Sequence, residues 1–220
     1  MNACGKPPVV YVVDDDDALR DSLRWLLESA GYKVSAHSTA ERFLLAYRPG
    51  MAGCLVLDVR MPGASGLELQ QELMRRAATL PIIFVTGHGT VSAGIRAMKG
   101  GAVDFLEKPV DEKELLGGIR QALRKSREAR AALTERVELE QRLGTLTVRE
   151  REVLDLVVTG ILNKQIGERL GVAEKTIKVH RGRVMQKMAA ASVADLVRML
   201  HKLGLETSTP LPDGRGTKGQ

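Results

Sequence analysis

Five short runs of β-branched and other apolar residues alternate with helix-period segments over the first 120 residues. This alternation constrains the fold more than any other feature, because parallel strands need a crossover connection, usually a helix, between them. It predicts an α/β doubly wound, five-stranded parallel sheet with helices on both faces. The predicted strands are residues 9–13, 32–37, 54–59, 81–86 and 102–106.

Side chains that favour helix ends mark the segments between these strands. At three positions a Ser or Asp is followed three residues later by Glu, a spacing that allows reciprocal capping of a first helical turn. Gly31 is suited to end the first helix, because glycine tolerates the left-handed conformation that often follows a helix. The expected capping pairs are Ser38 with Glu41, Ser65 with Glu68, and Asp111 with Glu114.

The second half of the chain reads as helices separated by glycine or small residues. This pattern predicts an all-α, four-helix domain over residues 145–206, separate from the α/β domain of residues 1–120. Thr147 and Glu150 form a further capping pair at its start. The polar, Pro- and Gly-rich residues 207–220 are expected to be disordered. The expected helices are 147–158, 163–170, 174–188 and 192–203, with a turn at Gly171.

Residues 121–144 connect the two predicted domains and are rich in Arg, Glu, Ala, Leu and Gln. This composition favours a solvated helical linker that continues the preceding helix. A flexible linker is one alternative. A short coiled-coil contact is another, although the apolar positions do not keep a clean heptad.

The excess of positive charge lies near the C-terminus. The chain has a formal net charge of +6, and residues 145–220 contain 13 Lys and Arg against 8 Asp and Glu. A basic domain of this kind indicates a nucleic-acid partner. We see neither a bilayer-spanning apolar segment nor a signal segment, and expect a cytoplasmic protein without membrane contact. Cys4 and Cys54 support neither a disulfide framework nor a thiolate metal site.

Polar residues gather where the predicted strands end: Asp14 and Asp15 after the first, Asp58 at the third, Thr86 at the fourth and Lys108 after the fifth. In a doubly wound sheet these positions meet at one rim. Carboxylates gathered there repel one another, which a hard cation such as Mg²⁺ offsets by binding one or two of them. A nearby hydroxyl and ammonium could hold phosphoryl oxygens, so the arrangement suits phosphoryl transfer to an Asp.

Four segments make the comparison with a known family specific. VVDDDD, LVLDVRMPGASG, IIFVTGHG and DFLEKP occur in an order and spacing that resembles the receiver domain of two-component response regulators, over residues 8–125. The resemblance implies a flavodoxin-like receiver fold in which Asp58 accepts a phosphoryl group from a sensor histidine kinase. It also implies Mg²⁺ as the cofactor.

The same resemblance implies roles for the other rim residues. The metal site consists of the acid pair Asp14 and Asp15 together with Asp58 and the backbone carbonyl of Arg60, in which Asp15, Asp58 and that carbonyl are the direct ligands. Thr86 and Lys108 contact the phosphoryl oxygens, and Phe105 is the aromatic switch residue. Arg60 and His88 occupy positions that tune the lifetime of the acyl phosphate.

Other roles fit these residues when each is taken alone. A strand-ending Asp often caps a turn or a helix, and Phe105 would fit a plain core. A haloacid-dehalogenase-type phosphatase also uses a strand-ending Asp with Mg²⁺, but it needs a second Asp where this chain has Arg60. Without that general acid we expect a slow self-phosphorylating switch and not an enzyme with outside substrates.

The predicted helix 174–188 has a polar side on which the sequence places basic residues without acids. This bias favours a phosphate-lined DNA groove, although any single lysine would also fit a solvated surface. The flanking residues could contact backbone phosphates. The predicted DNA-facing residues are Lys175, Lys178, Val179 and Gly182, flanked by Thr176, His180, Arg183 and Lys187.

The segments LTVREREVL, NKQI, LGV and KTIKVH resemble the effector domain of LuxR/NarL/FixJ-type regulators across residues 145–205. That family implies a helix-turn-helix domain whose third helix enters the major groove. Two positions depart from the family pattern. Gly182 stands where a longer contact side chain is frequent, and Ala173 stands where a Ser commonly caps the helix, a loss that costs about 0.5–2 kcal/mol.

Both halves together resemble full-length response regulators of the FixJ/NarL type. This implies a transcription factor whose partners are a cognate histidine kinase, double-stranded promoter DNA and, as a further candidate, RNA polymerase. Phosphorylation would control a homodimer formed through residues 90–106, with DNA half-sites roughly 34 Å apart. The alternative is a DNA-binding regulator controlled by a ligand or partner and not dependent on phosphorylation.

Overall fold

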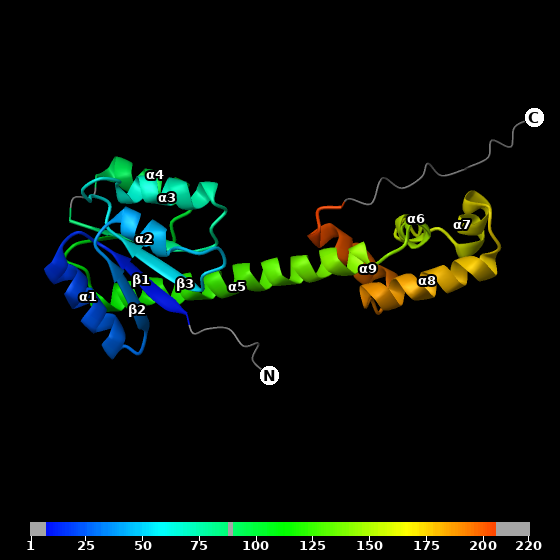
Figure 1. Cartoon of the computed structure of the whole chain (residues 1–220), viewed down its shortest axis with the longest axis horizontal. Coiled ribbons are helices and arrows are strands. Elements are labelled where there is room, and N and C mark those ends of the chain that lie inside the picture. Colours follow the sequence, from blue (N-terminus) through cyan, green and yellow to red (C-terminus); the bar gives the residue numbers. More distant parts are fainter. Residues whose placement is uncertain (1–7, 88–89, 206–220) are drawn as a thin grey trace, which may run out of the picture. The chain divides into compact units, whose positions relative to one another are not determined.

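The structure is a computed structural model that describes residues 8–87 and 90–205. The chain divides into two compact units, Met1–Ala132 and Leu133–Gln220, and Figure 1 labels most of their helices and strands. Residues 207–220, for which the sequence predicts disorder, lie outside the described residues.

The first unit contains a five-stranded parallel sheet in the order β2-β1-β3-β4-β5. The predicted doubly wound fold is therefore confirmed. The first strand has the predicted bounds, and the others differ from the prediction by one or two residues at their ends. The strands are β1 (Val9–Val13), β2 (Lys33–His37), β3 (Gly53–Leu57), β4 (Ile82–Thr86) and β5 (Asp104–Glu107).

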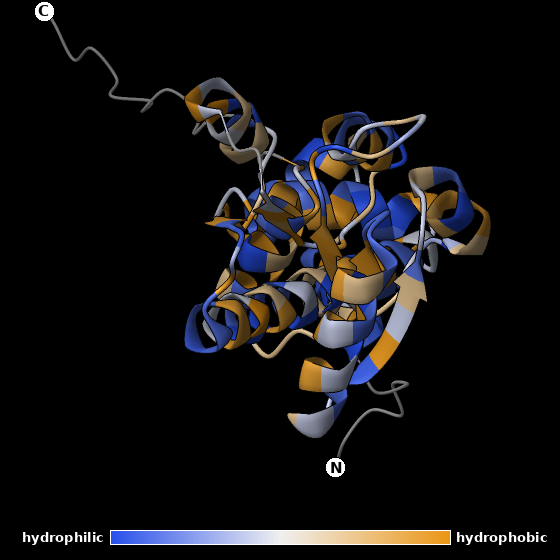
Figure 2. Ribbon diagram, turned by 90° about the vertical axis from the view of Figure 1, so that its left-hand side faces the viewer, coloured by the Kyte–Doolittle hydropathy of each residue, from blue (hydrophilic) through white to orange (hydrophobic). Residues whose placement is uncertain are grey.

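Helices cover both faces of this sheet, and each face has its own apolar core. Phe43, Leu69 and Ala97 come from α2, α3 and α4 and pack on one face. Leu27 and Ile119 come from α1 and α5 and pack on the other. In Figure 2 the inner strands are hydrophobic while the helices mix both colours, as expected for a sheet buried on both sides. The helices are α1 (Asp17–Ser29), α2 (Ala40–Ala46), α3 (Gly66–Arg75), α4 (Val91–Lys99) and α5 (Glu112–Gly144).

The strand order reverses between β1 and β3, because β1 lies between β2 on one side and β3 on the other. The loops after β1 and β3 consequently lead away in opposite directions, and the carboxyl ends of these strands border a crevice. Hydrogen bonds from Asp14 N to His37 O (3.2 Å) and from Asp58 N to Val13 O (2.9 Å) align the three strand ends. The fold thus brings Asp14 and Asp58 to the same edge.

The predicted capping pairs have different outcomes. Ser65 with Glu68 and Thr147 with Glu150 both form complete capping boxes. Asp111 Oδ1 accepts hydrogen bonds from the N–H groups of Lys113 (2.8 Å) and Glu114 (3.0 Å) at the start of α5.

The prediction for Ser38 and Glu41 is wrong. Thr39 caps α2, because the helix begins one residue later than the spacing suggested and Arg42 N donates to the Thr39 hydroxyl. Glu41 instead accepts a hydrogen bond from Ala64 N, at 3.1 Å, in the loop after β3.

Helix α5 runs without a break from Glu112 to Gly144. It includes residues 121–143, for which the sequence favoured a helical connector. In its first part Leu115, Ile119 and Ala122 are buried against the sheet.

Up to residue 205, where the described part of the second unit ends, this unit contains four further helices, and one side of each contributes to its core. Val153 and Leu154 of α6 pack with Ile166 of α7, Val184 of α8 and Leu196 of α9. Gly171, at φ 67°, makes the left-handed turn between α7 and α8. In the described residues, no helix is both long enough and apolar enough to cross a membrane. The helices are α6 (Val148–Val157), α7 (Asn163–Leu170), α8 (Glu174–Met188) and α9 (Val193–Lys202).

Candidate functional site

Two buried carboxylates and one ammonium group meet at the carboxyl edge of the sheet. Asp14 and Asp58 are only 2% and 5% exposed. Lys108 Nζ lies 2.8 Å from Asp14 Oδ2 and 2.9 Å from Asp58 Oδ1, so one cation bridges both acids. The sequence prediction that these three residues converge is therefore confirmed by their geometry.

Backbone N–H groups satisfy the remaining carboxylate oxygens. Asp16 N donates to Asp14 Oδ1 at 2.9 Å, and Arg60 N donates to Asp58 Oδ2 at 2.6 Å. With both acids ionised, the bridged group of Asp14, Asp58 and Lys108 has a net charge of −1. A net negative group of this kind favours a further cation nearby.

Burial and hydrogen bonds shift the pKa values of Asp14 and Lys108. Burial raises the pKa of Asp14, and the hydrogen bond from Lys108 opposes that shift only in part. Burial alone would lower the pKa of Lys108, but its bonds to Asp14 and Asp58 outweigh this, and the pKa lies above its ordinary value. Lys108 therefore stays charged across the physiological range.

The other predicted site residues differ in how far they are buried. Thr86 is 1% exposed at the end of β4, and its carbonyl accepts a hydrogen bond from Lys108 N at 3.0 Å. Asp15 is exposed. Phe105 is half-buried on β5, with its ring centroid 6.2 Å from that of Phe84. His88 lies outside the described residues.

The donor set suits Mg²⁺ in part. Within residues 8–87 and 90–205, no three His, Cys, Asp or Glu side chains gather as a metal-binding group. Lys108 occupies the space between Asp14 and Asp58, while Asp15 faces solvent. Mg²⁺ usually takes only one or two carboxylates and completes its octahedron with water and other oxygens. Asp15, Asp58 and the Arg60 carbonyl therefore have the right chemistry for Mg²⁺, and their role as ligands remains a prediction.

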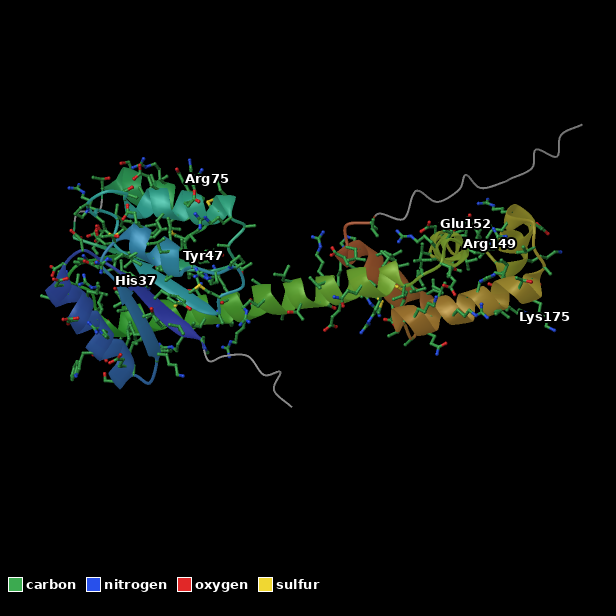
Figure 3. All side chains as sticks on the ribbon, in the orientation of Figure 1. His37, Tyr47, Arg75, Arg149, Glu152 and Lys175 are labelled. Atoms are coloured by element: carbon green, nitrogen blue, oxygen red, sulfur yellow. The ribbon has the colours of Figure 1, made fainter. Side chains whose placement is uncertain are left out.

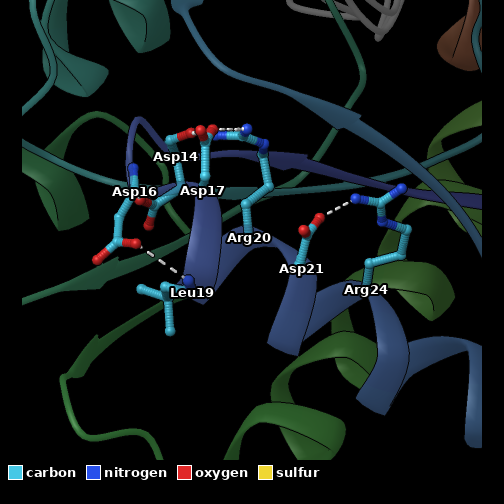
Figure 4. A network of polar contacts seen from close by, with 7 residues as sticks. All are labelled: Asp14, Asp16, Asp17, Leu19, Arg20, Asp21 and Arg24. Carbon is cyan, nitrogen blue, oxygen red and sulfur yellow. Dashed lines mark hydrogen bonds and ion pairs between the residues drawn. The ribbon is translucent and has the colours of Figure 1, made fainter.

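A further basic residue, Arg20, lies at this edge and was not predicted. Its Nη1 donates to the backbone carbonyl of Asp14 at 2.7 Å, and its Nη2 pairs with Asp17 (Figure 4). The i,i+3 spacing of Asp17 and Arg20 on a helix start could have indicated the ion pair. Nothing in the sequence indicated the bond to Asp14, because that bond depends on how β1 leads into α1.

The predicted DNA-facing side of α8 is largely solvent-exposed. Lys175 projects from the start of the helix in Figure 3, and Val179 is 49% exposed despite its apolar side chain. His180 and Lys187 are only partly exposed, and His180 Nδ1 is buried without a hydrogen-bond partner. The exposed residues of the predicted set are Lys175, Thr176, Lys178, Val179, Gly182 and Arg183.

Two lysines on α8 have acidic partners. The prediction that the polar side lacks acids is wrong, because Glu174 lies one turn before Lys178 and pairs with it at 3.1 Å. Lys187 Nζ contacts Glu150 Oε2 at 2.6 Å and the carbonyl of Thr145 at 3.0 Å. A phosphate contact by Lys187 would compete with this internal ion pair.

The helix-turn-helix is fixed by a side chain that the sequence did not single out. Arg149 of α6 donates through Nη2 to the Leu170 carbonyl, at 2.5 Å, at the end of α7, and through Nη1 to Glu152 (Figure 3). At the start of α8, Ala173 provides no side-chain cap. The turn therefore depends on Arg149 and Gly171, while the first turn of α8 lacks the side-chain cap that a Ser at position 173 could provide.

Two families match the chain. Residues 10–120 match the family described as response regulator receiver domain, and residues 144–200 match the family described as bacterial regulatory proteins, luxR family.

Curated relatives resemble the chain over most of its length. Nodulation protein W of Bradyrhizobium diazoefficiens is 47% identical over 200 residues, covering 91% of this chain and 88% of that protein. Transcriptional regulatory protein FixJ of Azorhizobium caulinodans is 48% identical over 190 residues, covering 86% and 90%. Response regulator protein TodT of Pseudomonas putida is 43% identical over 195 residues, covering 89% and 86%.

Solved structures agree with this likeness. The response regulator StyR superposes with a TM-score of 0.82 at 48% identity, covering 90% of this chain and all of that one. Full-length FixJ from B. japonicum superposes with a TM-score of 0.55 at 39% identity, covering 92% and 100%.

Proposed function

Because the chain belongs to the two-component response regulators with a LuxR-type DNA-binding domain, and is a transcription factor of the FixJ/NarL type, we propose that Asp58 is its phosphoryl acceptor. The observation that carries this proposal is the buried Asp58 carboxylate, bridged to Asp14 by Lys108. We assign the receiver to residues 1–120, the linker to 121–144 and the DNA-binding domain to 145–206.

The proposed reaction transfers a phosphoryl group from a phosphohistidine of the sensor kinase. An oxygen of Asp58 forms the new bond to phosphorus while the P–N bond breaks and the imidazole leaves. Bound Mg²⁺, held by Asp15, Asp58 and the Arg60 carbonyl, would neutralise negative charge that develops on the phosphoryl oxygens. Lys108 is placed to share that charge, since its ammonium already contacts Asp58.

Phosphorylation would act as a switch. The phosphoryl oxygens offer new acceptors to Thr86 and Lys108, and Phe105 would turn inward as Thr86 moves toward the phosphate. Such a change favours one of two pre-existing states. We propose that the favoured state pairs two chains through residues 90–106, and that paired α8 helices bind promoter DNA in the cytoplasm, with RNA polymerase as a further candidate partner.

Acetyl phosphate with Mg²⁺ is expected to phosphorylate the protein once per chain, and EDTA should prevent it. The reason is electrostatic: the group formed by Asp14, Asp58 and Lys108 has a net negative charge. It repels an incoming phosphate unless a second cation is bound. A phosphate-affinity gel measures the shifted fraction, and mass spectrometry after borohydride reduction locates the site. Equal phosphorylation in EDTA, or modification at a residue other than Asp58, would contradict the proposal.

Arg183→Ala is expected to lower the salt dependence of duplex DNA binding by about one unit of the log–log slope, because one fewer phosphate is neutralised. Fluorescence anisotropy with a labelled duplex at several salt concentrations gives the slope. Lys202→Ala is the matched control, since Lys202 lies on α9 and is paired with Glu135 at 2.5 Å. An unchanged slope for Arg183→Ala would remove this residue from the interface.

A further inference from the structure

Asp14 is held at its main chain as well as at its carboxylate. Its N–H donates to the carbonyl of His37 at the end of β2, and its own carbonyl accepts the hydrogen bond from Arg20 Nη1 at 2.7 Å. The guanidinium thus bonds the peptide group that joins Asp14 to Asp15 (Figure 4). It acts directly beside the exposed carboxylate that the proposed function assigns to Mg²⁺.

The environment of Arg20 differs from that of a surface arginine. Its side chain is only 14% exposed, although its ion-pair partner Asp17 is 84% exposed. The fork of the guanidinium allows two bonds in fixed directions, one to the Asp14 carbonyl and one to Asp17. This pins the end of β1 to the first turn of α1 across the four consecutive acids.

One turn further along α1, Arg24 provides a natural comparison. It forms the same kind of i,i+3 ion pair, with Asp21, but both side chains are largely exposed, at 45% and 65%. Figure 4 shows that Arg24 and Asp21 contact only each other among the residues drawn, whereas Arg20 reaches back to the strand end. The two arginines have the same charge and lie on the same helix, but only Arg20 bonds to Asp14.

We propose that Arg20 is a positioning residue for the metal site: it holds the loop of Asp14 and Asp15 in the conformation that binds Mg²⁺. This inference rests on the proposed function, because it concerns the Mg²⁺ used in phosphorylation of Asp58. Arg20 itself touches neither the metal nor the phosphoryl group.

Positioning and simple charge predict opposite effects on Mg²⁺. If Arg20 mattered only as a nearby cation, removing its charge would make the acidic loop more negative and Mg²⁺ would bind more tightly. If Arg20 holds the loop, its loss frees the Asp14–Asp15 peptide group and Mg²⁺ binds more weakly. Loss of a residue that orients metal ligands typically weakens binding by about tenfold or more.

The test is isothermal titration of the full-length protein with MgCl₂, for the wild type, Arg20→Gln, Arg20→Lys and Arg24→Gln. We expect Arg20→Gln to weaken Mg²⁺ binding about tenfold. Arg20→Lys keeps the charge but loses the fork, and we expect it to weaken binding to a smaller extent. Arg24→Gln should stay within twofold of wild type. Hydrogen exchange at the Asp15 and Asp16 amides should become faster in Arg20→Gln only.

Mg²⁺ binding by Arg20→Gln that equals or exceeds that of the wild type would overturn the positioning role. Weakening by Arg24→Gln to the same extent would also overturn it, because Arg24 pairs with Asp21 and makes no bond to the Asp14 carbonyl, so that bond could not be the cause. If the wild type binds Mg²⁺ and is phosphorylated, and the Arg20 variants bind Mg²⁺ as tightly as the wild type, only the positioning role of Arg20 fails. If the wild type neither binds Mg²⁺ nor is phosphorylated, the proposed function fails with it.

Discussion

Asp58→Asn is expected to abolish phosphorylation by a histidine kinase or acetyl phosphate, and with it any phosphorylation-dependent gain in promoter binding. An amide cannot form the acyl phosphate, and among the residues that the structure describes no other carboxylate contacts both Lys108 and the Arg60 N–H. Promoter binding measured by footprinting with and without phosphodonor should be identical for this variant. The binding of the unmodified wild type provides the reference level.

The substitution also changes the bridged group. Both carboxylate oxygens of Asp58 accept from donors, Lys108 Nζ at 2.9 Å and Arg60 N at 2.6 Å. The amide nitrogen of Asn must face one of these donors and leaves that contact unsatisfied. We therefore expect a small local rearrangement, and near-ultraviolet circular dichroism of the buried Tyr11 and Tyr47 during thermal unfolding establishes whether the receiver stays folded.

Asp21→Asn is the matched control for Asp58→Asn. Asp21 is also an aspartate of the receiver, but it is exposed and contacts only Arg24 among the polar contacts drawn in Figure 4. This variant should be phosphorylated and bind DNA like the wild type. A kinase response in Asp58→Asn equal to that of the wild type would mean that another residue accepts the phosphoryl group or that regulation does not need one.

The parts of the site that follow from strand ends could be predicted from the sequence. Apolar runs fix which segments are strands, and a parallel sheet necessarily brings their carboxyl ends to one edge. Asp14, Asp58 and Thr86 were placed correctly for this reason. Lys108 was placed correctly because it directly follows a strand.

Side-chain partners across the fold could not be predicted in the same way. The bond from Arg20 to the Asp14 carbonyl and the ion pair of Lys187 with Glu150 join residues whose spacing carries no periodic signal. These contacts depend on how the chain leaves a strand or on how α6 packs against α8. The pair of Lys178 with Glu174 was overlooked, although its i,i+4 spacing could have indicated it.

Glu150→Gln is expected to lower the thermal midpoint of the second unit on the order of 10 °C, because it removes the negative charge that pairs with Lys187 at a buried position. The Glu150 side chain is only 3% exposed, and its Oε2 accepts from both Lys187 Nζ at 2.6 Å and Thr147 N at 2.9 Å. Glutamine can still accept from Thr147 N in the capping box. The substitution therefore isolates the ion pair between α6 and α8.

The pH dependence of this contribution has a defined direction. The hydrogen bond from Lys187 and, after it, the hydrogen bond from Thr147 N lower the pKa of Glu150 from its ordinary value of 4.5 to about 2. A group whose pKa is lowered by folding stabilises the protein above its unfolded pKa, and this stabilisation disappears as the pH falls through the folded value. The difference in stability between the wild type and Glu150→Gln should thus have its full size near neutral pH and shrink as the pH falls from 4.5 to about 2.

The two units can be followed separately, because Trp25 and all three tyrosines lie in the first unit. Near-ultraviolet circular dichroism of the buried Tyr11 and Tyr47 reports the receiver, whereas far-ultraviolet circular dichroism also reports the helices of the second unit. Glu150→Gln should move the far-ultraviolet transition of the second unit and leave the near-ultraviolet transition unchanged.

Glu135→Gln is the control that separates burial from charge. Glu135 also joins two helices of the second unit, through Lys202 on α9, but about half of each side chain is exposed, at 51% and 53%. Solvent-exposed pairs contribute little, so this variant should unfold like the wild type. If Glu135→Gln and Glu150→Gln lower the thermal midpoint equally, burial adds nothing to the contribution of the Glu150–Lys187 pair. If the double variant Glu150→Gln with Lys187→Met recovers the thermal midpoint of the wild type, the main cost of Glu150→Gln is the uncompensated charge of Lys187.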